Sequence, residues 1–221
     1  MKLLAIDTAT EACSAALYID GDIIEKYELA PRKHSELILP MVDTLLAEAD
    51  IKLTSLDALA FGRGPGAFTG VRITAGVIQG LAFASNLPTI PISTLAAMAQ
   101  SAVNESKTII SAIDARMDEI YVGMFSVGDN NIVIPVSEEQ VIAPENVNFD
   151  LPSDCFGVGS GWDAYGQILS EKVGNKLKGY NARRYPSASN ILKLAAIEFI
   201  AGNVLEAADA LPVYLRNKVT R

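Results

Sequence analysis

Short apolar runs near the start of the chain alternate with polar positions in the way that β-strands do. From His34 onward, apolar side chains recur at the spacing of a helix that buries one side. Two further apolar runs then flank a second helix, which is rich in small residues. The expected strands are residues 3–6, 13–19, 23–29, 58–61 and 89–92, and the expected helices are residues 34–49, 68–85 and 93–103. Together they form a βββαβαβα unit.

The pattern starts again after the polar break at residues 104–107. The expected strands of this half are residues 108–114, 119–127, 132–137 and a run that begins at 155, and the expected helices are residues 163–171 and 187–201. In each half the first strand ends at an aspartate, Asp7 or Asp114, and a hairpin follows. The chain is therefore expected to contain the same unit twice.

This duplication is the plan of the actin-like, sugar-kinase and Hsp70 (ASKHA) fold, which is a two-lobed α/β fold. Because the polar break separates the two repeats, we place an N-terminal lobe at residues 1–104 and a C-terminal lobe at residues 105–221. The extended tail at residues 211–216 is a candidate to fold back onto the first lobe.

The helix at residues 34–49 has a wider apolar face than contact with one sheet requires. Pairs of adjacent apolar residues recur along it, at Leu37-Ile38, Met41-Val42 and Leu45-Leu46. A helix that only covers its own sheet needs an apolar face of roughly 100°. The pairs widen the face beyond this, so we hypothesise that the helix is buried on two sides.

The helix at residues 68–85 carries small residues along much of its length. Gly76 and Gly80 stand one helical turn apart, and each interior glycine costs about 1 kcal/mol relative to alanine. The absence of side chains lets another backbone approach closely. That neighbour is either the protein's own sheet or a second protein, and the sequence leaves both interpretations open.

A glycine-rich loop at residues 62–66 joins a buried strand to this helix, and such an arrangement often binds phosphate. The lysine of a P-loop is missing, because Gly70 is followed by Val71 and Arg72. Gly62-x-Gly64-x-x-Ala67 fits the loose dinucleotide pattern, but no acidic residue follows at the distance that would hold a ribose. Neither nucleotide motif is complete.

An actin-like nucleotide cleft would draw on residues at the ends of the first strands, where magnesium and phosphate bind. The candidates for such a vestigial cleft are Asp7, Thr8, Thr10, Gly64, Gly66 and Asp114. However, Glu11 in the first turn would repel a phosphate, and this turn has no glycine whose amide could wrap around one. We therefore expect no ATP hydrolysis and leave weak nucleotide binding open.

Composition narrows the class of protein. The formal charge of −8 argues against a chain that grips nucleic acid by itself. The single histidine, His34, excludes a two-histidine metal site, so we expect neither a metal nor another cofactor. No apolar run reaches the length of a membrane span, and the first residues are typical of a strand and not of a signal peptide. We expect a cytoplasmic protein with no membrane partner and with Cys13 and Cys155 reduced.

Five motifs together closely resemble the TsaB (YeaZ) family, whose members act in bacterial tRNA threonylcarbamoyladenosine biosynthesis. The motifs, in the order of the family and across the whole chain, are Leu4–Ser14, His34-Ser35-Glu36, Gly64–Arg72, Asp114-Ala115-Arg116 and Pro212–Arg216. Members of the family are paralogues of the catalytic subunit TsaD, which carries a His-x-x-x-His metal pair on the helix after the fifth strand. Here that helix begins Ser93-Thr94-Leu95-Ala96-Ala97, without a histidine.

The resemblance implies a non-catalytic platform subunit that binds and activates TsaD. TsaD would then transfer threonylcarbamoyl to adenosine 37 of tRNAs that read codons starting with A. TsaE would complete the complex, tRNA would be reached only through the complex, and the chain alone would form a homodimer. In the family, first-lobe helices of the two proteins pack as a four-helix bundle. The interface residues implied here are His34, Leu37, Ile38, Met41, Leu45, Arg72, Ile73, Gly76, Val77 and Gly80.

Two other functions stay open at this point. Relatives of this fold have been described as glycoproteases, but a hydrolase would have to work here without a metal pair or a Gly-x-Ser-x-Gly nucleophile turn. An ATP-dependent small-molecule kinase would use the same fold. Turnover by the isolated chain would favour either of these functions over the platform.

Overall fold

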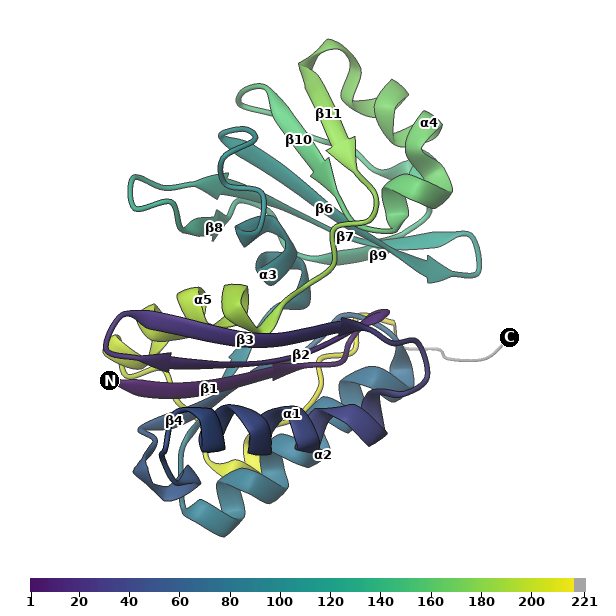
Figure 1. The fold of residues 1–221 in the computed structure, drawn as a ribbon. Coiled ribbons are helices and arrows are strands. Elements are labelled where there is room, and N and C mark those ends of the chain that lie inside the picture. Colours follow the sequence, from purple (N-terminus) through teal and green to yellow (C-terminus); the bar gives the residue numbers. More distant parts are fainter. Residues whose placement is uncertain (217–221) are drawn as a thin grey trace. The chain divides into compact units, whose positions relative to one another are not determined.

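The computed structural model describes residues 1–216 and divides them into two compact units (Figure 1). The first unit contains residues 1–97 and 186–213, and the second contains residues 98–185 and 214–216. The long helix after residue 186 thus belongs to the first unit, although the sequence pattern placed it in the second half. The last residues of the predicted C-terminal lobe, 217–221, lie outside the described residues.

The first unit is built on a mixed sheet with the strand order β3-β2-β1-β4-β5. Its strands are β1 (Lys2–Asp7), β2 (Ala12–Ile19), β3 (Asp22–Leu29), β4 (Ala58–Gly62) and β5 (Thr89–Ile92). The first three strands are antiparallel, and β4 and β5 extend the sheet in parallel with β1. Every residue of β1 from Leu3 to Asp7 is buried, because this strand is central and helices cover both faces of the sheet.

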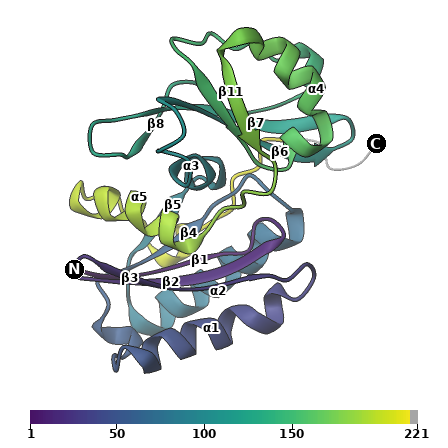
Figure 2. The ribbon, with the colours of Figure 1, turned by 45° about the horizontal axis from the view of Figure 1, so that its top comes forward.

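The helices of the first unit lie on opposite faces of its sheet (Figures 1 and 2). They are α1 (His34–Glu48), α2 (Phe68–Ser85) and α5 (Ala188–Ile200). Helix α3 (Thr94–Gln100) follows β5 and contains the boundary between the two units. Helices α1 and α2 lie side by side on one face, and α5 covers the other. Leu4, Phe61 and Leu59 of the sheet pack with Ile38 of α1 and Ile78 of α2 in the core between them.

The start of α5 is held to the sheet by side chains of β2 and β3. The Ala188 N–H donates to Ser14 Oγ at 2.9 Å. The N–H and the hydroxyl of Ser189 donate to the two carboxylate oxygens of Glu25 at 2.8 and 2.9 Å. The first N–H groups of a helix have no partner within it and carry its positive dipole end, so a carboxylate satisfies them well. These contacts fix α5 over the first sheet.

The second unit repeats the strand order of the first. Its sheet runs β11-β10-β6-β7-β8, and β9 pairs with β7 outside this path. Its elements are β6 (Thr108–Arg116), β7 (Glu119–Val127), β8 (Val133–Pro135), β9 (Gln140–Ile142), β10 (Cys155–Val158), α4 (Gly161–Val173) and β11 (Leu177–Asn181). Three antiparallel strands are again followed by two strands that run parallel to the first. The α/β class and the duplicated plan of the actin-like fold are therefore confirmed.

The two units differ after their third strand. In the first unit α1 follows β3, whereas in the second unit β9 and a 3₁₀ turn stand between β8 and β10. The prediction of a full βββαβαβα repeat is wrong at this point. Residues 143–154 contain Pro144 and Pro152 and lack helical apolar spacing, so they favour turns. The short 3₁₀ helices of the described chain are Leu53–Ser55, Pro144–Asn146, Gly174–Lys176 and Ala207–Asp209.

The core of the second unit is centred on Trp162, at the start of α4. Its side chain is buried, and its Nε1–H donates to the Ile110 carbonyl at 3.2 Å. Gly157 of β10 leaves room for the indole ring, which a side chain at that position would overlap. The ring stacks on Tyr180 with centroids 5.3 Å apart.

Across residues 1–216, no helix is both long and apolar enough to cross a membrane.

Candidate functional site

Helix α2 has one side in the core and one side open to solvent. Its inner residues are buried against β1 and β4, and they are Val71, Thr74, Ala75, Ile78 and Ala82. The outer side carries Arg72, Gly76, Gly80 and Phe83, which are all exposed. The Arg72 guanidinium lies over the Phe68 ring, 3.6 Å from its centroid. The small residues of α2 thus fall on both sides of the helix, in different surroundings.

Gly76 and Gly80 face open space. A side chain added at either glycine would meet no atom within 4 Å. The interpretation that these two glycines make room for the protein's own sheet is therefore wrong. They leave a stretch of helix backbone uncovered on the outside of the first unit, where another molecule can approach it closely.

Phe83 continues the row of Gly76 and Gly80, and its side chain is 85% exposed. It stands three residues after Gly80 and seven after Gly76, which places all three on the same face of the helix. Ile73 and Val77 are half-buried beside the glycines. We call Ile73, Gly76, Val77, Gly80 and Phe83 the α2 surface. Sequence reasoning missed Phe83, although its spacing from the glycines was a signal that could have identified it.

Helix α1 offers less outer surface than was predicted. Ile38 and Leu45 are fully buried and His34 is 9% exposed, so these three side chains belong to the interior of the first unit. This corrects the predicted interface, from which these three residues are removed. Leu37 and Met41, which are both half-buried, are the predicted interface residues of α1 that remain. The reason is geometric: residues spaced by three or four form one row along a helix, and the row of His34, Ile38 and Leu45 faces the sheet.

The hydroxyl of Thr8, a predicted phosphate ligand, is engaged by α2. Thr8 Oγ1 donates to the Gly70 carbonyl at 2.7 Å and lies 2.6 Å from Thr74 Oγ1. The Thr8 N–H donates to the same Thr74 oxygen at 3.0 Å. Both polar groups of Thr8 are fully buried within the first unit. The turn after β1 is therefore fastened to α2.

The glycines at the start of α2 make room for the chain itself. A side chain at Gly66 would overlap the carbonyl oxygen of Ala9, and one at Gly70 would overlap the carbonyl oxygen of Thr8. The Ala67 N–H also donates to the Ala9 carbonyl, at 2.7 Å. The missing side chain of Gly66 thus admits the backbone of the β1–β2 turn, and its place in a nucleotide cleft stays a prediction.

Gly64 and Thr10 also accept hydrogen bonds from within the first unit. The Gly64 carbonyl accepts a hydrogen bond from the Thr94 N–H at 3.0 Å, and its backbone has a φ of +95°, which favours glycine. Thr10 is 8% exposed, and its Oγ1 accepts the Ala12 N–H at 3.4 Å. The glycine loop thus contacts the start of α3, the start of α2 and the β1–β2 turn, all inside the first unit.

Asp7 is a buried carboxyl group at the end of β1. Its Oδ1 accepts the Ala9 N–H at 3.0 Å, whereas its Oδ2 has no hydrogen-bond partner and lies against Gly62. Burial raises the pKa of Asp7 to about 7, and the hydrogen bond from Ala9 opposes this shift. A side chain at Gly62 would overlap the carboxylate, so this glycine is needed to accommodate Asp7.

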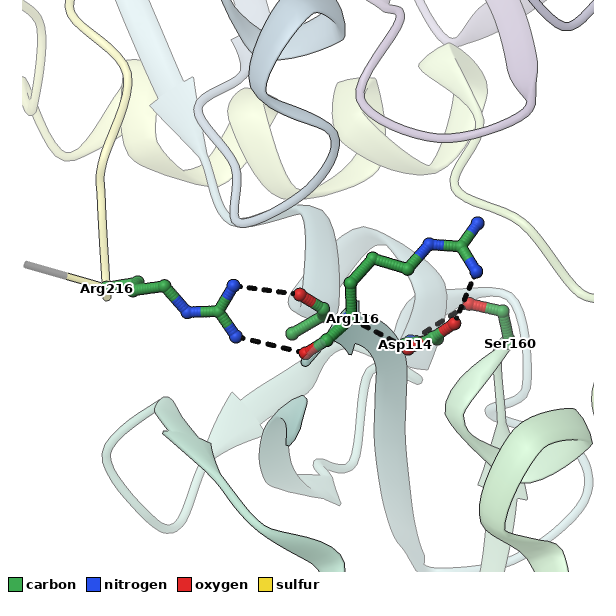
Figure 3. A network of polar contacts seen from close by, with 5 residues as sticks. Asp114, Arg116, Ser160 and Arg216 are labelled. Atoms are coloured by element: carbon green, nitrogen blue, oxygen red, sulfur yellow. Dashed lines mark hydrogen bonds and ion pairs between the residues drawn. The ribbon is translucent and has the colours of Figure 1, made fainter. Parts of the chain in front are cut away.

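Asp114, the counterpart of Asp7 in the second unit, is bound to its own hairpin (Figure 3). Its carboxylate accepts the Arg116 N–H at 2.8 Å and forms an ion pair with Arg116 Nη1 at 3.0 Å. Its N–H donates to Ser160 Oγ at 3.1 Å. Asp7 and Asp114 lie in different units, so the predicted vestigial cleft stays a prediction. Between residues 1 and 216, no group of three His, Cys, Asp or Glu side chains is placed to hold a metal ion.

The two cysteines are buried and are not joined in a disulfide. Burial raises the pKa of Cys13 to about 11, and the charges of Asp7 and Glu28 add to this shift. Burial likewise raises the pKa of Cys155 to about 11. Thiols with such pKa values stay protonated at neutral pH and are poor nucleophiles.

Comparisons with known proteins place the chain in a family. A family model described as TsaD, tRNA N6-adenosine threonylcarbamoyltransferase, matches residues 23–219. The tRNA threonylcarbamoyladenosine biosynthesis protein TsaB of Haemophilus influenzae is 44% identical over an alignment of 230 residues, which covers 100% of this chain and 95% of the relative. TsaB of Escherichia coli is 43% identical, with 99% of this chain and 96% of the relative covered.

A solved structure supports the same assignment. YeaZ from Pseudomonas aeruginosa superposes with a TM-score of 0.90 at 45% identity, and the match covers 97% of this chain and 99% of that one. The family-model match also relates the chain to TsaD. The chain belongs to the TsaB (YeaZ) family of tRNA threonylcarbamoyladenosine biosynthesis proteins.

Proposed function

We propose that this chain is a platform subunit that binds TsaD through the α2 surface. In this proposal TsaD performs the threonylcarbamoyl transfer to tRNA, and the chain supports the transfer without catalysing it. The observation that carries the proposal is the α2 surface itself: bare helix backbone at Gly76 and Gly80, flanked by half-buried aliphatic side chains and by the exposed ring of Phe83.

The shape and chemistry of the α2 surface suit a partner helix. Two glycines one turn apart let a second helix come closer than side chains would allow, and neighbouring aliphatic groups supply apolar contact. Phe83 is a large and exposed aromatic residue, and such residues often anchor protein interfaces. The relation to TsaD supports the choice of partner, because the family resemblance implies matching first-lobe helices on both proteins. Leu37 and Met41 would extend the interface onto α1.

The chemistry of the predicted nucleotide residues also favours a platform. The hydroxyl of Thr8 is hydrogen-bonded to Gly70, and the carboxylate of Asp114 is paired with Arg116. The formal charge of −8 favours indirect access to tRNA, through the complex with TsaD and TsaE. No observation in the described residues specifically favours the hydrolase or the kinase.

The direct test is to titrate the purified chain into TsaD of the same organism and to follow binding by calorimetry. The tRNA modification assay is then run with and without this chain, in the presence of TsaE and the enzyme that makes threonylcarbamoyl-adenylate. We expect saturable binding and modification that depends on the chain. Modification at an undiminished rate without the chain, or turnover by the chain alone, would overturn the proposal.

The role of the α2 surface is tested by Gly80→Leu, because a leucine there meets no atom of the chain. We expect the free energy of unfolding to stay equal or to rise by about 1 kcal/mol, since leucine is the better helix former. Affinity for TsaD should fall about tenfold or more, because the added side chain overfills the interface.

The matched control is Ala164→Leu, which adds the same kind of side chain to an exposed position of α4 in the second unit. It should leave the affinity for TsaD unchanged. Equal affinity of the Gly80→Leu variant and the wild type would show that this part of α2 lies outside the interface, even if the chain is a platform.

A further inference from the structure

The hairpin between β6 and β7 has an unusual backbone. Arg116, Met117 and Asp118 are consecutive residues with φ of 60°, 57° and 60°, and none of them is glycine. Residues other than glycine pay an energetic cost in this left-handed region, because their Cβ comes close to the backbone. Here three consecutive residues pay that cost. The side chain of Arg116 is 81% exposed and Met117 is 39% exposed, so core packing does not offset the cost.

Arg216 holds this hairpin from the far end of the described chain (Figure 3). Its Nη1 donates to the Ala115 carbonyl at 3.0 Å, and its Nη2 donates to the Arg116 carbonyl at 3.2 Å. Nη2 also forms an ion pair with the carboxylate of Glu119, on the other side of the turn. The side chain of Arg216 is only 17% exposed. One guanidinium therefore bridges both strands of the hairpin.

Asp114 completes the arrangement from the opposite side. Its carboxylate accepts the Arg116 N–H, while Arg216 binds the Arg116 carbonyl, so both backbone polar groups of Arg116 are held from outside the turn. The N–H of Asp114 is in turn fixed by Ser160 at the start of α4. Strained backbone persists where surrounding contacts hold it, and here these contacts come from three separate places in the chain.

We propose that Arg216 is a positioning residue that latches the hairpin at residues 115–118 in its left-handed conformation. Without the latch the hairpin opens and becomes mobile, while the rest of the second unit stays folded. The planar guanidinium is needed because two nitrogens at a fixed spacing reach two carbonyls and a carboxylate together, which a lysine ammonium cannot do. The proposal goes beyond the platform role and does not depend on it.

The test is limited trypsin digestion of the full-length chain, with cleavage sites identified by mass spectrometry. Trypsin cuts after arginine, so an open hairpin exposes the bond between Arg116 and Met117. In Arg216→Met we expect cleavage at this bond to be at least about tenfold faster than in the wild type, since local opening controls access of the protease. Cleavage elsewhere in the second unit and the midpoint of urea unfolding should change little.

Two further variants make the test specific. Lys178→Met removes an exposed ion pair with Asp154 in the same unit, and it should leave cleavage after Arg116 unchanged. Arg216→Lys keeps the charge but loses the guanidinium, and it should be cleaved nearly as fast as Arg216→Met. Wild-type resistance of either Arg216 variant would overturn the latch. An equal rise in cleavage at all sites of the second unit would also overturn it, because Arg216 would then stabilise the unit as a whole.

Discussion

Glycine serves two opposite purposes within α2 and the loop before it. At Gly66 and Gly70 the missing side chain admits carbonyl oxygens of the β1–β2 turn. At Gly76 and Gly80 nothing of the chain occupies the space. Glycine is therefore required by the fold at Gly66 and Gly70. At Gly76 and Gly80 the fold has room for a side chain.

This difference predicts that replacing glycine by alanine has opposite effects on stability at the two kinds of position. Gly66→Ala should lower the free energy of unfolding by about 1–3 kcal/mol, because its methyl group overlaps the Ala9 carbonyl. Gly76→Ala should raise it by about 1 kcal/mol, since alanine is the better helix former and meets no atom. Urea unfolding of both variants measures the two changes. Similar effects of the two substitutions would contradict this account of the glycines.

The raised pKa of Asp7 predicts that the free energy of unfolding depends on pH. Its pKa is about 7 in the folded state, whereas the ordinary pKa of an aspartate is 3.8, so between these two pH values the folded state holds a proton that the unfolded state has lost. The free energy of unfolding therefore falls as the pH rises through this window, by up to about 4 kcal/mol for a shift of this size. Asp7→Asn removes the titration, and its stability relative to the wild type should rise by a similar amount from pH 4 to 8.

Urea unfolding at several pH values measures this difference. Asp43→Asn is the control, since Asp43 is an exposed carboxylate on α1. Its stability relative to the wild type should stay nearly constant over the same range. Parallel pH curves for Asp7→Asn and the wild type would mean that the buried carboxylate is already ionised at low pH.

At the scale of elements, α5 shows how a helix is placed by residues far away in the sequence. Periodicity predicted where it begins and ends to within a residue, because its apolar spacing is regular. Its place on the first sheet comes from Ser14 and Glu25, 174 and 164 residues earlier than the residues they bind. Such long-range contacts leave no periodic signal.

The contact between Glu25 and Ser189 predicts that the protein loses stability when the Glu25 carboxylate is removed. Glu25→Ala removes the acceptor for the Ser189 N–H and hydroxyl, and it should lower the free energy of unfolding by about 1–2 kcal/mol, as the loss of a helix cap does. Hydrogen exchange at the first turn of α5 should become faster. Glu28→Ala on the same strand removes an exposed carboxylate and should have neither effect. Equal exchange in both variants would argue against the cap.

At the scale of the whole molecule, the strands and helices of both units were largely predictable because their apolar patterns are strong. Strands β9 and β11 were missed, since β9 has three residues and Leu177–Asn181 is polar and contains a glycine. The outer glycines of α2 were predicted to belong to the site, but the sequence could not say which side they face. Arg216 was missed as a contact of the hairpin because about 100 residues separate them.

The division of the first unit between residues 1–97 and 186–213 has a consequence for the synthesis of the protein. A ribosome completes the first sheet early, but the helix that covers its second face emerges only after all of residues 98–185. Until then Ile191 and Leu192, which are fully buried in the finished protein, cannot cover that sheet. Newly made chains therefore carry an open apolar sheet face from the completion of that sheet until α5 emerges, and chaperones that bind such surfaces have a long interval in which to engage them.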